Sequence, residues 1–322
     1  MNGESRGARF WLRLGGTLLM LILLVVLLLQ QDWQELLAAF RRISLGRLAL
    51  ATLLMFVSRT AVGLRWHVLL RTANAPVRAG ESVRITYAGL FSSNFLPTTI
   101  GGDVVRLFGA VQMRIDPATA TASLVMDRLV GMAGMALFLP IAFARLAEIG
   151  LPALLQQPST MLWGFSFAAI PAAGMLRSGW EKIGKFVRRT LADMATWLKQ
   201  PGSLLRSLLF TLIHQAALYT TIWLLLDGMG EPVSWWQIGG IWSFVYFVTL
   251  LPVSINGYGL QEVSTTLLYA NMGGISTEAS ITLALLVRAI TVLVSLPGAL
   301  FAPAIIAASR KNPLPETAKD LS

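Results

Sequence analysis

Two proline-and-glycine motifs interrupt long apolar stretches of this chain at matching places. LPTTIGG at residues 96–102 returns 155 residues later as LPVSING at residues 251–257. Proline lacks a backbone donor and glycine is costly to order, so both residues break helices. Within a membrane, a broken helix is tolerated only where its backbone is buried in protein or lines a watery cavity. Two such breaks in two halves of a chain therefore predict a transporter's binding site.

The composition predicts an all-α polytopic membrane protein. Of the 322 residues, 55% are hydrophobic and only 13% are charged, whereas soluble domains carry about 25% charged residues. The chain has no cysteine and only two histidines, His67 and His214, so neither a metal site nor a cofactor is expected. We assign the net charge of +10 to cytoplasmic basic loops that meet anionic lipid headgroups, and expect no nucleic-acid binding.

Hydropathy predicts about six spanning helices and two broken helices. A span needs about 20 apolar residues, and six stretches qualify: roughly 11–29, 48–70, 118–143, 159–176, 204–226 and 279–306. The broken segments cover roughly 85–110 and 236–270, and we expect both to be re-entrant. Amphipathic stretches at 32–47 and 180–199 are expected to lie on the membrane surface.

This arrangement predicts a topology and an inverted repeat. If both broken segments are re-entrant, both termini and the basic loops after the second and fourth spans are cytoplasmic, as the positive-inside rule requires. Arg41, Arg42 and Arg47 do not fit this rule, because the predicted topology places them on the outer side of the membrane. The expected parts are a cytoplasmic N-terminus (1–11), a transmembrane domain (12–308) with inverted repeat units at about 48–145 and 203–306, and a cytoplasmic tail (309–322).

Two arginines lie within the second predicted span. Arg59 is near its centre, where an arginine costs at least about 2.5 kcal/mol and usually faces a bundle interior or a cavity. Arg65 comes about two turns later. Its side chain either faces the same interior or extends to the membrane surface. We therefore take Arg59 as a candidate binding residue.

The first break is followed by charged residues. If a helix restarts at Gly101–Gly102, its N-terminus offers free N–H groups and a positive dipole end. Asp103 either contacts substrate there or only caps the helix. Arg106, one turn on, has a guanidinium fork that matches phosphate oxygens.

Three more charges lie well inside predicted spans: Asp127, Arg128 and Arg288. Neighbouring helix residues point about 100° apart, so Asp127 and Arg128 need partners on other helices. They form either an internal ion pair that only fixes helix packing or a charged site for a lipid headgroup.

The second break is followed by Gly257-Tyr258-Gly259 and Glu262. This is not a dinucleotide fingerprint, since the spacing is wrong and no strand precedes it. Asn94, Tyr258 and Glu262 are candidate polar contacts near the two breaks, although Glu262 also suits the first turn of a restarting helix. The full predicted substrate-binding set is Arg59, Asn94, Pro97, Gly101, Gly102, Asp103, Arg106, Asp127, Arg128, Pro252, Gly257, Tyr258, Gly259, Glu262 and Arg288.

Three of these motifs carry a resemblance to a known family: residues 94–106, Asp127-Arg128, and the stretch from Pro252 to Glu262. Together they resemble the lysylphosphatidylglycerol synthase transmembrane region, over roughly residues 12–308. That region is the flippase-like part of the multiple peptide resistance factor proteins and also occurs alone. The resemblance implies lipid movement between leaflets, without the aminoacyl-transferase domain of the two-part members.

The sequence therefore predicts a multi-pass lipid flippase of the bacterial inner membrane that moves a phosphate-bearing phospholipid or glycolipid. It is expected not to be an enzyme, and no GxxxxGK[ST] motif for ATP occurs. One alternative is a non-catalytic accessory subunit of an envelope-lipid or glycolipid pathway. Another is a membrane-embedded lipid transferase, disfavoured by the few acidic residues. A second copy of the chain or an envelope-lipid enzyme is a candidate partner.

Overall fold

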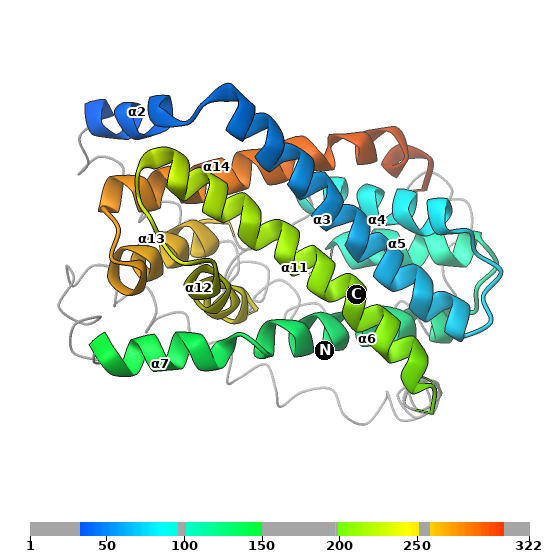
Figure 1. Ribbon diagram of the computed structural model, residues 1–322. Coiled ribbons are helices and arrows are strands. Elements are labelled where there is room, and N and C mark those ends of the chain that lie inside the picture. Colours follow the sequence, from blue (N-terminus) through cyan, green and yellow to red (C-terminus); the bar gives the residue numbers. More distant parts are fainter. Residues whose placement is uncertain (1–32, 96–100, 150–196, 198, 251–257, 306–322) are drawn as a thin grey trace, which may run out of the picture. The chain divides into compact units, whose positions relative to one another are not determined.

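The computed structural model describes residues 33–95, 101–149, 197, 199–250 and 258–305, and within these ranges every regular element is a helix (Figure 1). The all-helical fold expected from the sequence is thus confirmed for the described residues. The helices are α2 (Trp33–Arg42), α3 (Leu45–Thr72), α4 (Ala79–Ser93), α5 (Gly101–Gln112), α6 (Pro117–Ala136), α7 (Leu139–Ile149), α11 (Pro201–Met229), α12 (Trp235–Thr249), α13 (Leu260–Gly273), α14 (Thr277–Ser295) and the 3₁₀ helix η2 (Leu296–Leu300).

Three stretches of the described chain are long and apolar enough to cross a membrane: α3, α11, and α14 together with η2. A fourth candidate is the bent pair α6 and α7. These four stretches coincide with the second, fifth, sixth and third predicted spans. The first and fourth predicted spans and the basic stretch 180–199, apart from Trp197 and Lys199, lie outside the described residues.

The third predicted span is not one continuous helix. It bends by 43° between α6 and α7. Pro140 lies at the second position of α7 and has no N–H to donate to the carbonyl of Ala136, where α6 ends. The sixth span likewise changes from α to 3₁₀ geometry at Leu296, next to Pro297. The uniform apolarity of both stretches hid these local breaks.

Short polar residues start several of the helices. Ser44 Oγ accepts from the N–H of Arg47 at the start of α3, and Ser234 and Gln237 form a capping box on α12. Asp116 Oδ2 accepts from two N–H groups in the first turn of α6, each at 3.1 Å. These caps satisfy backbone donors that helix geometry leaves without partners.

The chain forms two compact units. Unit 1 contains described residues 33–54, 135–149, 218–250 and 258–291, and unit 2 contains 55–95, 101–134, 197, 199–217 and 292–305. Each unit holds one of the two broken segments: α12 and α13 in unit 1, and α4 and α5 in unit 2.

In unit 2, α4 packs tightly against α5 and η2. A Cβ on Gly89 would lie 2.6 Å from the carbonyl oxygen of Gly102, and one on Gly298 would lie 2.0 Å from that of Tyr87. Only glycine permits such close approach of two backbones. Around this contact lies an apolar core that includes Trp66, Ile85 and Val105.

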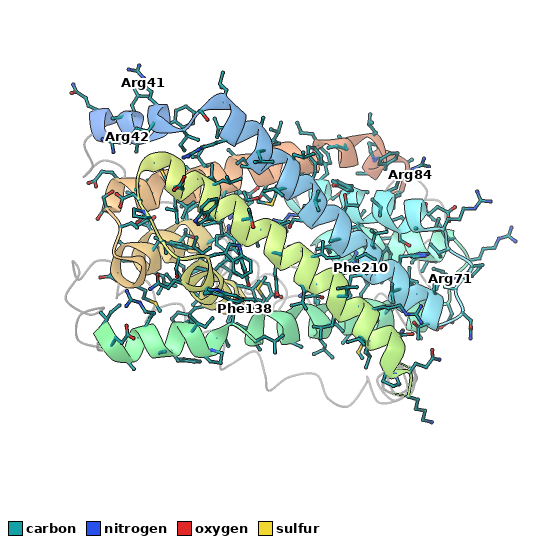
Figure 2. The ribbon with its side chains drawn as sticks, in the orientation of Figure 1. Arg41, Arg42, Arg71, Arg84, Phe138 and Phe210 are labelled. Atoms are coloured by element: carbon teal, nitrogen blue, oxygen red, sulfur yellow. The ribbon has the colours of Figure 1, made fainter. Side chains whose placement is uncertain are left out.

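In unit 1, α12 packs against both α13 and α7. Gly239 and Gly240 bring α12 close to Phe138, labelled in Figure 2, and to the backbone N of Ala142. The ring of Phe138 also makes an edge contact with Tyr219, with centroids 5.1 Å apart. Aromatic packing of this kind fixes the position of the second broken segment.

The order of elements in residues 45–149 recurs in residues 201–305. A long helix (α3, α11) comes first, then two helices separated by a break (α4 and α5; α12 and α13), then an apolar helix with a proline-linked extension (α6 and α7; α14 and η2). Helices α3 and α11 have 28 and 29 residues, and α4 and α12 both have 15. The match thus extends beyond the two motifs to whole elements.

Two of the three arginines that conflict with the predicted topology, Arg42 and Arg47, contact neighbours in unit 1. Arg47 forms a 2.8 Å ion pair with Asp227, and Arg42 donates to the carbonyl of Met229. Arg41 and Arg42 extend from the last turn of α2 (Figure 2). The partners of Arg42 and Arg47 belong to the end of α11, so local pairing accounts for these two positive charges.

Candidate functional site

The side chain of Asp127 on α6 is the centre of a buried charge cluster in unit 2. Its Oδ1 accepts from Nε of Arg65 on α3 at 2.6 Å, and its Oδ2 accepts from Nη2 of Arg106 on α5 at 2.9 Å. All three side chains are less than 10% exposed. Buried charges are tolerated only when paired in this way.

The cluster continues from Asp127 toward the surface. Arg106 donates from Nη1 to Oδ1 of Asp103 at 3.1 Å, and Oδ2 of Asp103 accepts from Arg128 at 2.6 Å. The side chain of Arg128 is 44% exposed. The five residues, hereafter the unit 2 cluster, thus form a continuous chain of charges from the interior to an accessible arginine.

Neighbouring groups hold the unit 2 cluster in place. The guanidinium of Arg106 lies over the fully buried ring of Trp66, 4.5 Å from its centroid, and Trp66 Nε1 donates to Oγ of Ser123 at 3.0 Å. A Cβ on Gly131 would lie 2.9 Å from Nη1 of Arg65, so the glycine leaves room for that guanidinium. The geometry is therefore fixed by packing as well as by charge.

Arginines outnumber carboxylates among the five residues of the unit 2 cluster. Three arginines form ion pairs with two aspartates. In addition, Nε of Arg106 is buried and has no hydrogen-bond partner among the described residues. An uncompensated donor in a buried cationic cluster favours an anionic ligand.

Arg65 is a member of the unit 2 cluster that was not in the predicted binding set. Extension to the membrane surface was the alternative for this residue, but its side chain is buried and paired with Asp127. Asp127 and Arg128 do find partners on other helices, as predicted. Arg65 could have been identified from the need of the buried Asp127 for cationic partners. The two residues are 62 positions apart, so no local sequence pattern shows that they pair.

A second, smaller cluster lies in unit 1, after the other break. Nε of Arg288 on α14 donates to Oε1 of Glu262 on α13, and the guanidinium lies 4.6 Å from the ring centroid of Tyr258. Gly259, between Tyr258 and α13, has φ +76°, a conformation that side-chain-bearing residues rarely adopt. Tyr258 and Gly259, both predicted site residues, thus lie at a backbone turn that positions Glu262 near Arg288.

Helix α13 carries buried oxygen atoms without partners. Oε2 of Glu262 and the hydroxyls of Ser264, Thr265 and Thr266 have no hydrogen bond within the described residues. Comparable hydroxyls elsewhere, such as Thr86 on α4, bond the carbonyl four residues earlier. Buried polar atoms in this state call for a ligand or water.

The remaining predicted site residues lie apart from both clusters or outside the described residues. Asn94 caps the end of α4 and donates to Oγ of Ser295 at 2.8 Å, and Arg59 is half-buried on α3. Gly101 is buried in the first turn of α5. Pro97, Pro252 and Gly257 lie outside the described residues.

Gly102, predicted as a substrate-binding residue at the start of the restarting helix, lies at a close helix contact. A Cβ there would lie 2.8 Å from the carbonyl oxygen of Gly89 on α4. The residue therefore serves helix packing within the broken segment. In the described part of the chain, no group of three or more His, Asp or Glu side chains is placed to bind a metal.

Comparison with known proteins identifies the family. The sequence pattern of the lysylphosphatidylglycerol synthase TM region matches residues 13–298, most of the chain. None of the curated proteins matches this chain significantly. Together with the apolar helices, the match indicates a membrane protein with a lipid-related role. The chain belongs to the lysylphosphatidylglycerol synthase TM region family.

Proposed function

We propose that this protein moves a phosphate-bearing lipid between membrane leaflets, and that the unit 2 cluster binds the headgroup. The observation that carries the proposal is the buried Nε of Arg106, which has no hydrogen-bond partner among the described residues and lies in a cluster of three arginines and two aspartates. A guanidinium binds phosphate through parallel charge-assisted hydrogen bonds. Such bonds are stronger in the buried part of the cluster than in water.

The accessible end of the unit 2 cluster is where a headgroup would first bind. Arg128 is 44% exposed, while Arg106 has a buried Nε available as a further donor. A phosphate that displaces the carboxylate of Asp103 from these arginines would exchange one anion for another. Little reorganisation is then needed, because the packing of Trp66 already holds Arg106 in position.

The two clusters also support the proposal of an inverted repeat. Asp103 and Glu262 lie in the first turns of the helices that follow the breaks, α5 and α13. Their partners, Arg128 and Arg288, lie 25 and 26 residues later on α6 and α14. In the topology we propose, these equivalent pairs serve breaks that open to opposite sides of the inner membrane, with both termini cytoplasmic.

Glu262 is the better candidate for coupling transport to a proton or a cation. Both oxygens of Asp127 accept hydrogen bonds from arginines, so this carboxylate has little capacity to take up a proton. Oε2 of Glu262, in contrast, is buried without a partner among the described residues, beside unpartnered hydroxyls on the same helix. In this proposal, Oε2 is the oxygen that Glu262 offers to the coupling ion.

Leaflet exchange in reconstituted liposomes tests the proposal. With a fluorescent anionic phospholipid in both leaflets, the parent should let an added quencher bleach nearly all of the fluorescence, and empty liposomes about half of it. Arg128→Gln should slow exchange at least about tenfold through the loss of a charge-assisted contact. The matched control is Arg114→Asn, which removes an exposed arginine charge outside the cluster and should exchange like the parent.

The same experiment separates the alternatives. If the folded parent shows no exchange above empty liposomes, the accessory-subunit hypothesis is favoured. Chemical change of the lipid, detected by mass spectrometry after incubation, would favour a transferase. Equal activity of Arg128→Gln and the parent would remove the unit 2 cluster from the transport path.

A further inference from the structure

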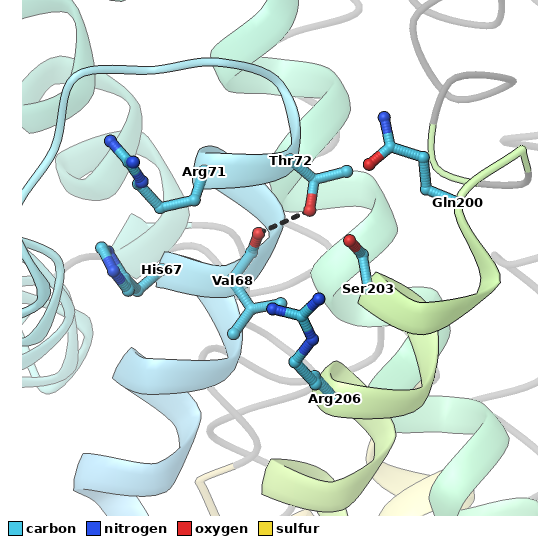
Figure 3. Close-up of a pocket in the computed structure, with 7 residues that line it drawn as sticks. All are labelled: His67, Val68, Arg71, Thr72, Gln200, Ser203 and Arg206. Carbon is cyan, nitrogen blue, oxygen red and sulfur yellow. Dashed lines mark hydrogen bonds between the residues drawn. The ribbon is translucent and has the colours of Figure 1, made fainter.

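A cavity of about 470 Å³ lies in unit 2 between the last turns of α3 and the first turns of α11 (Figure 3). Among the described residues that line it, the fully charged ones are Arg71 and Arg206, and there is no carboxylate. We call it the basic pocket. It shares no residue with the unit 2 cluster, and its lining residues are His67, Val68, Arg71, Thr72, Gln200, Ser203 and Arg206.

The basic pocket has hydrogen-bond donors to spare. Arg206 and Ser203 extend from α11 toward Val68 and Thr72 of α3 (Figure 3). Nε of Arg206 donates to the carbonyl of Gly202, which leaves both terminal nitrogens for a ligand. The guanidinium of Arg71, another lining residue, has no hydrogen bond or ion pair within the described chain. The pocket also adjoins the positive N-terminal end of the 29-residue helix α11.

The walls of the basic pocket are held together by an apolar contact beneath it. Trp197 is fully buried, packs with Leu69 and Met126, and donates from Nε1 to the carbonyl of Leu69 at 2.9 Å. This contact ties the segment before α11 to the end of α3. The pocket is therefore preformed, which lowers the entropic cost of binding.

The ends of these helices are expected at headgroup depth. Helix α3 has 28 residues, and at about 1.5 Å per residue it is roughly 42 Å long, whereas the hydrocarbon core of a bilayer is about 30 Å thick. The last turn of α3 and the first turn of α11 then extend into the headgroup layer. Arginines in that layer meet lipid phosphates.

An apolar strip on α11 begins beside the basic pocket. Leu205, Leu209 and Leu212 are exposed and spaced four and three residues apart, so they share one face of the helix. Arg206 borders this face on the side of Ser203. A ligand in the pocket would thus have phosphate contacts and an apolar surface next to each other, which matches an anionic phospholipid.

We propose that the basic pocket binds the phosphate of an anionic phospholipid, with acyl chains along Leu205 and Leu209. This is a second lipid site, separate from the unit 2 cluster. It does not depend on the proposed function, because a lipid can occupy it whether or not the protein moves lipids. A lipid headgroup and free phosphate would both offer the pocket a phosphate group. We assign the phosphate to a lipid of the surrounding membrane.

Thiol protection can test the site in the full chain, because the chain has no cysteine. In nanodiscs, Ser203→Cys should react with a maleimide at least about tenfold more slowly with phosphatidylglycerol than with phosphatidylcholine alone. Gly80→Cys, at an exposed position with open space around it, should react equally in both. Adding Arg71→Gln and Arg206→Gln to Ser203→Cys should abolish the protection. Adding Lys199→Gln and Arg114→Asn, two exposed charges outside the pocket lining, should preserve it.

Each other outcome overturns part of the proposal. Protection by inorganic phosphate in phosphatidylcholine nanodiscs, equal to that by phosphatidylglycerol, would assign the pocket to free phosphate and refute the lipid assignment. No protection by either, or protection that survives loss of both pocket arginines, would refute the site itself. Size-exclusion profiles like the parent's establish that each variant is folded.

Discussion

Nε of Arg65 donates a 2.6 Å hydrogen bond to Oδ1 of Asp127, although 62 residues separate them in the chain. Both side chains are nearly inaccessible, and Asp127 has a second arginine, Arg106, on its other oxygen. The pair therefore joins α3 to α6 through buried charge in unit 2. Breaking it leaves charge buried, which is the basis of the first prediction.

Asp127→Asn should destabilise the protein by about 3–5 kcal/mol, because Arg65 and Arg106 lose their common counter-charge. Asp227→Asn is the matched control: it breaks a pair whose side chains are both 40% exposed, which is worth at most about 1 kcal/mol. Fluorescence-monitored unfolding in detergent measures both. Equal unfolding midpoints for the two variants would contradict the buried pairing.

Gly102→Ala should strongly destabilise unit 2. The new Cβ would lie 2.8 Å from the carbonyl oxygen of Gly89, so α4 and α5 would have to separate. Gly80→Ala, where nothing lies within 4 Å, should be neutral or stabilising by up to about 1 kcal/mol. The yield of monodisperse protein and the midpoint of unfolding report the difference. If Gly102→Ala is as stable as Gly80→Ala, the close contact is wrong.

Arg128→Gln and Arg288→Gln should differ in stability despite their equivalent positions. Without Arg128, Asp103 keeps its contact with Arg106, so the cost should stay below about 1 kcal/mol. Without Arg288, the buried Glu262 loses its cation, and the cost should reach about 3 kcal/mol. Unfolding midpoints at neutral pH test this order. The reverse order would exclude burial as the determining factor.

The proposed inverted repeat predicts opposite accessibility of the two broken segments. A single cysteine at Arg78, before α4, should react with a membrane-impermeant maleimide only from the cytoplasmic side. A single cysteine at Pro232, before α12, should react only from the outside; both positions are exposed. Inside-out and right-side-out vesicles separate the two faces. Labelling of both positions from one face would rule out the inverted arrangement.

Glu262→Gln should remove any dependence of lipid exchange on a proton gradient while leaving passive exchange measurable. The amide keeps the shape and can still contact Arg288, but it cannot bind a proton. The comparison is leaflet exchange in liposomes with and without an imposed pH difference. A gradient effect that persists in Glu262→Gln would remove this residue from coupling, and the absence of an effect in the parent would indicate facilitated movement.

The sequence by itself determined the helical class, the family and the approximate positions of most helices. These properties depend on local chemistry: apolar runs exclude water, prolines remove donors and short polar residues cap first turns. The predicted spans overlap the four candidate spans of the described chain, with ends that differ by up to six residues. The bend before Pro140 was not predicted, because the stretch on both sides is equally apolar.

Only the tertiary structure decided which charges meet and what the glycines do. Arg65 became part of the unit 2 cluster because α3 and α6 pack side by side, and Gly102 proved to be a helix contact because α4 lies against it. Pairing between residues far apart in the chain depends on packing that no local pattern encodes. The unit 2 cluster and the basic pocket therefore form only when the helices of unit 2 are assembled.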